Sequence, residues 1–158
     1  MKYDDFLDYI LPFGVSFPDN ENERIAVLDK ICSVAGKKEL HYLWSSYRSP
    51  RFIAQKKISC RQNEYRSTAE KIFTEEKYIT VIDSCCFEDN DRHIIFQSDR
   101  KSLTDILTHF YWELDEIYIS NSDLDWFISV NHNFELHFYC KEDSSWLTYY
   151  KSKLIIEN

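Results

Sequence analysis

The chain has 158 residues, 4 Trp, 11 Tyr and 11 Phe, a formal net charge of −8, and only 2 glycines. This length fits a single domain with its own core, expected to span residues 1–158. With Gly14 and Gly36 alone, the chain has no glycine-rich phosphate loop and no G-x-S-x-G turn of serine hydrolases.

The N-terminal third of the sequence predicts a helix followed by a strand. Asn20 and Glu23 have the spacing of a capping box, apolar residues follow at helical spacing, and Gly36 is a natural stop. A helix is therefore expected from Glu21 to Ala35. The aromatic run over residues 40–47 favours a strand.

The middle of the sequence changes from a helical to a strand period. Apolar residues at helical spacing predict a helix from Glu64 to Glu76. Short β-branched runs over residues 77–84 and 92–97 predict two strands. The polar residues 88–91 between them predict a turn.

Residues 102–140 predict one helix followed by three strands. A capping box at residues 102–105 marks the start of a helix. Apolar residues follow at helical spacing, at positions 103, 106, 107, 110, 111 and 114, which predicts that the helix has one apolar face. Strands are expected over residues 116–120, 126–131 and 134–140, the last two half-buried because apolar and polar positions alternate. The predicted fold class is α+β, with helices packed on one face of a mainly antiparallel sheet.

The cysteines and the N-terminus indicate the compartment. The five cysteines have no C-x-x-C spacing, and Cys85 and Cys86 are adjacent, which suits neither a disulfide nor zinc. The first nine residues include three aspartates, unlike a signal peptide, and no run is long enough to span a membrane. We expect a cytoplasmic protein with no membrane contact, whose cysteines are small buried apolar residues.

No complete catalytic or metal-binding arrangement is visible in the sequence. His132 and His137 lack the spacing of zinc ligands, and Cys140 lies on the opposite face of a strand from His137. Paired acids such as Asp115 and Glu116 suit turns and caps better than acid–base catalysis. We therefore predict no catalytic residue, no metal and no cofactor.

Charge is distributed unevenly along the chain. Residues 48–77 hold eight bases and four acids, whereas residues 83–143 hold four bases and fourteen acids, a net charge of −10. The basic segment is interpreted as a salt-bridged amphipathic helix, with a nucleic-acid platform as the alternative. The acidic balance argues against nucleic-acid binding and favours a basic protein partner; a solvated face that keeps the chain soluble is the alternative.

A resemblance covers roughly residues 93–140. In it a helix leads to Glu116-Ile117-Tyr118-Ile119, and a second strand of the form acid-Trp-hydrophobic runs over residues 125–133 to an Asn-His pair. This pattern resembles small bacterial proteins, some of them similar to the immunity proteins of polymorphic-toxin systems. In those the strand closes on N-H-H, but Asn133 stands here in place of the second His. The resemblance implies the fold and an immunity-like role, and no catalytic residue.

These observations together predict a non-enzymatic binding protein, an immunity protein that neutralises a basic toxin domain by covering it. The partner-binding residues are expected among the acids of exposed connections, namely Glu88, Asp89, Asp91, Asp123, Glu142 and Asp143. One alternative is a small hydrolase that uses Asp83, His132 or Cys140. A second is an adaptor or structural subunit with an aromatic interface. The sequence specifies neither the partner's identity nor the oligomeric state.

Overall fold

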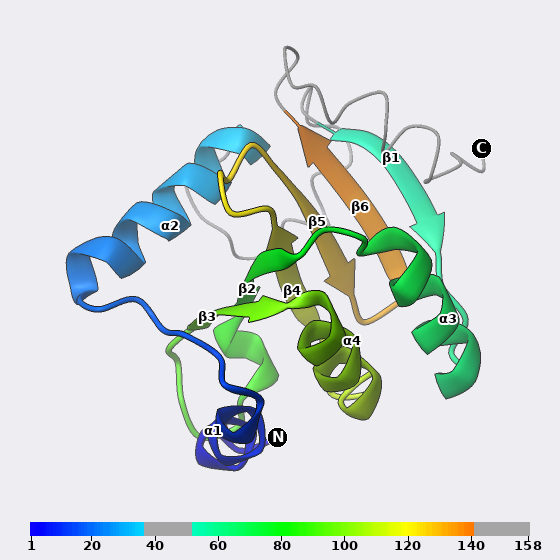
Figure 1. Ribbon diagram of the computed structural model, residues 1–158, viewed down its shortest axis with the longest axis horizontal. Coiled ribbons are helices and arrows are strands. Elements are labelled where there is room, and N and C mark those ends of the chain that lie inside the picture. The colour runs from blue at the N-terminus through cyan, green and yellow to red at the C-terminus, as the bar shows by residue number, and fades with distance from the viewer. Residues whose placement is uncertain (37–51, 141–158) are drawn as a thin grey trace.

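Six strands form one antiparallel sheet in the order β1-β6-β5-β4-β2-β3 (Figure 1). The computed structural model describes residues 1–36 and 52–140, so the strand expected at 40–47 lies outside the described residues. The described elements are α1 (Tyr3–Ile10), η1 (Leu11–Phe13), α2 (Glu21–Ala35), β1 (Phe52–Lys57), α3 (Gln62–Ile72), β2 (Lys77–Ile82), η3 (Ser84–Cys86), β3 (Ile94–Asp99), α4 (Arg100–His109), β4 (Glu116–Ser120), β5 (Trp126–Asn131) and β6 (Glu135–Cys140).

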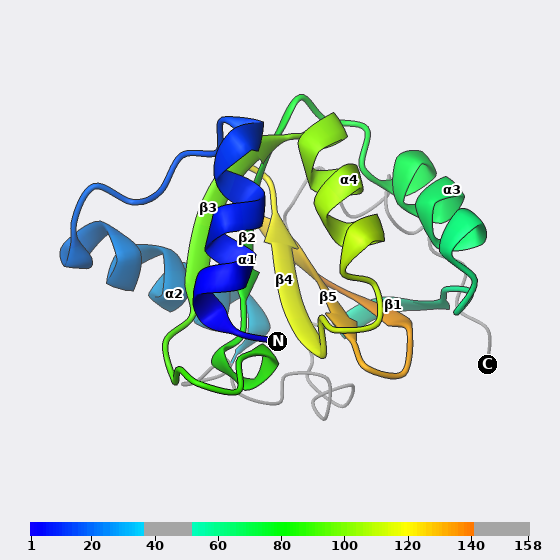
Figure 2. The ribbon, with the colours of Figure 1, turned by 90° about the horizontal axis from the view of Figure 1, so that it is seen from below.

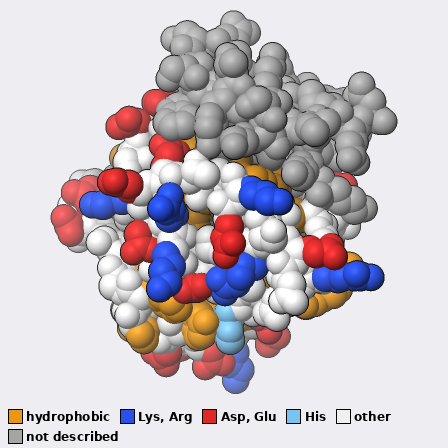
Figure 3. Space-filling model, turned by 45° about the vertical axis from the view of Figure 1, so that its right-hand side comes forward, with side chains coloured by type: hydrophobic (Ala, Val, Ile, Leu, Met, Phe, Trp, Pro, Cys, Tyr) orange, Lys and Arg blue, Asp and Glu red, His pale blue; other side chains and the backbone are white. Residues whose placement is uncertain are grey.

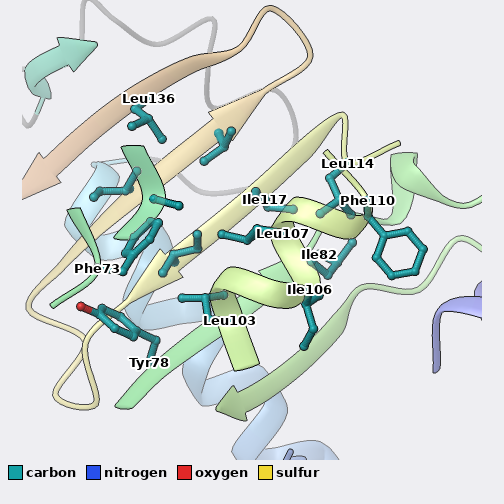
Figure 4. Packing of buried hydrophobic residues seen from close by; sticks show 14 of the residues in the cluster. Phe73, Tyr78, Ile82, Leu103, Ile106, Leu107, Phe110, Leu114, Ile117 and Leu136 are labelled. Atoms are coloured by element: carbon teal, nitrogen blue, oxygen red, sulfur yellow. The ribbon is translucent and has the colours of Figure 1, made fainter. Parts of the chain in front are cut away.

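The larger core lies between the sheet and three helices. Figure 2 shows α1, α4 and α3 side by side over the same face. From α4, Leu103, Ile106 and Leu107 point toward Ile82 and Ile117 of the sheet, and all five side chains are buried (Figure 4). This apolar stripe is the one that the sequence predicted, and its burial fixes α4 on the sheet.

The fourth helix covers the opposite face. Buried Ile31 and Val34 of α2 form a second apolar cluster with Tyr118, Phe127 and Tyr139 of the sheet. The α+β class with an antiparallel sheet is confirmed, but helices lie on both faces rather than on one. Consequently β5 is buried along its whole length instead of half-buried, because alternate side chains enter the two clusters.

Capping residues determine where two of the helices begin. The bounds predicted for α2 are confirmed, since Asn20 Oδ1 accepts the Glu23 N–H at 2.9 Å and Gly36 ends the helix at φ 70°. Helix α4 begins earlier than predicted because Asp99 is its cap and accepts the Ser102 N–H at 2.7 Å. Ser102 is thus a donor inside the first turn rather than the cap.

Other bounds shift by a few residues. Helix α3 starts two residues earlier than expected and ends at Ile72 instead of Glu76. Strand β1 lies within the basic segment, where no strand was predicted, and pairs with β6. None of the described helices combines the length and the apolar composition needed to cross a membrane, and the longest, α2, has 15 residues.

The turns before and after β5 are built alike. In each, an asparagine side chain accepts the backbone N–H four residues later, at 3.0 Å and 3.2 Å, and the residue before that donor has a left-handed φ. The residues are Asn121, Leu124 (φ 56°) and Asp125 in the first turn, and Asn131, Phe134 (φ 58°) and Glu135 in the second. Phe134, predicted to begin a strand, is therefore the last residue of a turn.

Candidate protein-binding site

Three connections lie together at one end of the sheet, along the lower edge of Figure 2. They are residues 83–93 between β2 and β3, residues 110–115 between α4 and β4, and residues 132–134 between β5 and β6. The strand registers place them there, since Ile82 pairs with both Ile94 and Ile117, and Val130 pairs with Leu136. We call these three connections the loop end.

The connection 83–93 is held at its base by buried polar groups. The Asp83 side chain, 0% exposed, accepts the Cys85 N–H at 3.0 Å and the Tyr118 hydroxyl at 3.1 Å. The Ser84 N–H donates to Nδ1 of His93 at 2.8 Å, so Nδ1 carries no proton in this arrangement. Burial, followed by the charges of nearby carboxylates, raises the pKa of Tyr118, which keeps its hydroxyl proton in the hydrogen bond.

The tip of this connection contacts the first residues of the chain. Glu88 accepts a hydrogen bond from the amino group of Met1 at 3.1 Å, and Asp89 accepts the Tyr3 N–H at the start of α1 at 2.9 Å. The Glu88 side chain nevertheless remains 72% exposed, and Asp89 and Asp91 are also exposed. The tip is therefore fixed in place while its carboxylates face solvent.

Helix α1 adds further carboxylates beside this tip. Asp4 and Asp5 lie in its first turn, Asp8 lies one turn later, and all three are exposed. An open hollow of about 640 Å³ runs along the tip. We call this set of six exposed side chains the acidic surface: Asp4, Asp5, Asp8, Glu88, Asp89 and Asp91.

The other predicted binding residues do not join the acidic surface. Asp123 is exposed but follows β4, at the opposite end of the sheet from the loop end. It lies near Glu75, and the charges of Asp123 and Asp125 both raise the pKa of the Glu75 carboxyl. Glu142 and Asp143 lie outside the described residues. Three of the six predicted acids are thus brought together, and one is separated from them.

The loop end also holds an exposed tryptophan. Trp112 is 61% exposed, the largest value among the exposed large hydrophobic residues described. Glu113 and Asp115 beside it are exposed as well. The apolar stripe predicted from the sequence continues past α4 to positions 110 and 114 but omits 112, and this offset was the available signal that Trp112 faces away from the core.

The groups considered for hydrolysis are not assembled into a site. Asp83 faces the α2 side of the sheet at the loop end, and His132 is exposed in the turn after β5. Cys140 pairs with Trp126 at the other end and faces the larger core. His137 is buried on the α2 side, as expected from its offset to Cys140, and burial lowers its pKa.

The adjacent cysteines differ in exposure. Cys86 is buried as expected, and so are Cys32 and Cys140, but Cys85 and Cys60 are exposed, which corrects the expectation that the cysteines are all buried. A hydrogen bond to Cys86, followed by partial burial, raises the pKa of the Cys85 thiol, so its thiolate is disfavoured as a nucleophile. Among the described residues, no group of three His, Cys, Asp or Glu side chains could hold a metal ion.

The basic segment forms internal ion pairs where it is described. Nη1 of Arg66 in α3 lies 2.8 Å from Oδ1 of Asp105 in α4 and 3.9 Å from Oε1 of Glu70. Nη1 of Arg61 lies 3.6 Å from Oε1 of Glu64. Figure 3, turned toward the α3 side, shows basic and acidic side chains next to one another. The predicted salt-bridged, amphipathic helix is confirmed for α3.

Comparison of the chain with protein-family models, curated proteins and solved structures found no match.

Proposed function

We propose that this protein binds a basic protein partner through the acidic surface and catalyses no reaction. The observation that carries the proposal is the gathering of six exposed carboxylates on α1 and the tip of connection 83–93. Three basic groups lie beside them: Arg92 pairs with Glu21 at 2.9 Å, the Met1 amino group pairs with Glu88 at 3.1 Å, and Lys2 is exposed before α1. Six carboxylates against these bases leave the surface net negative. A surface of net negative charge attracts a basic protein and raises its association rate.

The rigidity of connection 83–93 supports the same function. Its base is closed by the bonds of Asp83 and His93, and its tip is tied to Met1 and Tyr3. A surface that is already ordered loses little conformational entropy when a partner binds. Loops carried on a rigid sheet are a common location for recognition residues.

We further propose that the role is that of an immunity protein. A toxin domain that cleaves nucleic acid needs a basic surface to hold phosphates, and an acidic protein can cover that surface. The resemblance of residues 93–140 to immunity-like proteins is consistent with this role. The inhibited activity would be blocked by occlusion alone.

Co-expression with a basic toxin domain encoded beside this gene tests the proposal. We expect restored growth and a complex that co-purifies. The double variant Asp8→Asn, Asp91→Asn should reduce the association rate about 3- to 10-fold at low salt, with a smaller effect at high salt. The matched control Asp29→Asn, Glu76→Gln removes two exposed acids elsewhere and should leave the rate unchanged.

Absence of both rescue and complex would refute the immunity role. Equal association rates for the acidic-surface variant and the matched control would refute binding through the acidic surface.

An adaptor or structural subunit is the second candidate, and the exposure of Trp112 is the observation that favours it. Self-association through this residue would bring Glu113 and Asp115 of two copies together, and like charges repel at such a contact. Sedimentation of the wild-type chain and of Trp112→Ala distinguishes the two functions. A dimer that Trp112→Ala dissociates would support the structural role.

A further inference from the structure

We propose that Trp112, Tyr111 and Phe134 form an aromatic platform that receives an arginine side chain of the partner protein. This inference rests on the proposed function, because it adds an anchor point to the acidic surface at the same end of the sheet. It names the side chain that the partner presents, which electrostatic attraction alone does not specify.

The platform is built so that the indole of Trp112 is supported from within. The Phe134 ring lies 5.1 Å from it at an interplanar angle of 86°, and the Tyr111 ring lies at 5.7 Å and 54°. Beneath them, the buried Tyr65 ring contacts both Tyr111 at 5.8 Å and Phe134 at 6.4 Å. The indole is therefore held by aromatic neighbours while 61% of Trp112 faces solvent.

The turn between β5 and β6 sets the position of the Phe134 ring. The φ of 58° at Phe134 is left-handed, as is that of Leu124 in the matched turn before β5, so this conformation belongs to the turn. The ring then lies against Trp112 on one side and buried Tyr65 on the other.

The charges beside the platform determine which side chain fits. Exposed Glu113 and Asp115 lie within three residues of Trp112, whereas the nearby base Arg61 is paired with Glu64 at 3.6 Å. A planar guanidinium can stack on an indole and donate hydrogen bonds to a carboxylate at the same time. An ammonium group lacks the planar stacking surface, so arginine is favoured over lysine. Trp and Arg are also the residues most enriched among interface hot spots.

Fluorescein-labelled peptides test the platform without knowledge of the natural partner. The probes are (Arg-Gly)4, (Lys-Gly)4 and the uncharged (citrulline-Gly)4, and fluorescence anisotropy at low salt measures their binding to the full chain. We expect the arginine peptide to bind at least about fivefold more tightly than the lysine peptide, and the citrulline peptide to bind weakest.

Variants at Trp112 then separate stacking from apolar contact. Trp112→Leu keeps an apolar side chain but removes the aromatic face, so it should weaken the arginine peptide about 5- to 10-fold and abolish its preference over lysine. Trp112→Phe should retain part of the preference. Leu11→Ala, at another hydrophobic residue that is 54% exposed, is the matched control and should change nothing. Thermal unfolding of each variant verifies that the fold is retained.

The outcomes distinguish the platform from the acidic surface. In one outcome the arginine and lysine peptides bind equally, Trp112→Leu leaves their binding unchanged, and the double variant Asp8→Asn, Asp91→Asn weakens it. This result would overturn the platform and leave the proposed function standing. Failure of both basic peptides to bind overturns the platform and removes the electrostatic basis of the proposed function. Trp112-dependent dimerisation without peptide also overturns it, in favour of a second copy as the occupant.

Discussion

Replacement of Glu75 by Gln should change how stability depends on pH. Glu75 lies just before β2, at the end of the sheet opposite the loop end, and its Oε2 atom is buried and accepts no hydrogen bond within the described part of the chain. Burial raises the pKa of this carboxyl from 4.5 to about 7, and the charges of Asp123 and Asp125 add to the effect.

The direction in which stability changes with pH follows from proton binding. Between pH 4.5 and about 7 the folded chain holds a proton on Glu75 that the unfolded chain has released, so the free energy of unfolding decreases as pH rises through this window. The full difference in pKa corresponds to about 3 kcal/mol at 1.36 kcal/mol per pKa unit. Because the side chain is partly exposed, solvent screening reduces the expected destabilisation above pH 7 to about 1 to 2 kcal/mol.

Urea denaturation of the wild-type chain and of Glu75→Gln, measured from pH 5 to pH 8, tests this reasoning. The variant should have a flatter pH profile and exceed the wild type by about 1 to 2 kcal/mol at pH 8, since its amide never ionises. Glu76→Gln, at the exposed neighbour, is the control and should follow the wild-type profile within about 0.5 kcal/mol. Parallel profiles for Glu75→Gln and the wild type would refute the assignment.

Three further substitutions test the contacts that maintain the fold. Phe6→Ala removes a fully buried ring that contacts three other rings, and chemical denaturation should show a loss of about 3 to 5 kcal/mol. Tyr118→Phe removes the donor to buried Asp83 and should cost about 1 to 3 kcal/mol; an unchanged stability would show that this bond does not hold the loop base. Asp99→Ala removes the α4 cap and should cost about 0.5 to 2 kcal/mol at pH 7. Because hydrogen bonds from Ser102 lower the pKa of Asp99, that difference should disappear as pH falls through the folded-state pKa; a difference that persists in acid would contradict the capping role.

The sequence predicted elements well where local signals agreed. Helix α2 has a cap at Asn20 and a left-handed stop at Gly36, so both of its ends are determined by nearby residues. The start of α4 was displaced because Asp99 and Ser102 are both good capping residues, and local chemistry alone does not choose between them. Contacts of the extra turn distinguish the longer helix, since Asp99 accepts the Ser102 N–H at 2.7 Å and the Thr104 hydroxyl donates to the Arg100 carbonyl at 2.9 Å.

The burial of both sheet faces could not be predicted from strand patterns. Ser129 and His137 alternate with apolar residues and so resemble solvent-facing positions. Both are nevertheless buried, on the face of the sheet that α2 covers. Nor could the pattern separate Glu88 from Asp123, because both lie on loops. Their separation depends on β2 and β4 being antiparallel neighbours, so that the loops following them lie at opposite ends. Strand pairing is a long-range property that no short segment contains.

The matched turns around β5 have a consequence for strand alignment. A shift of one residue would move Ser129 and Asn131 into the cluster beneath α4 and drive Trp126 and Ile128 toward α2. Asn121 and Asn131 each close their turn with a side-chain amide, so both ends of β5 are clamped independently. Misaligned hairpins would lose both clamps and the apolar core together, so contacts within β4, β5 and β6 are enough to distinguish their correct alignment from a shifted one.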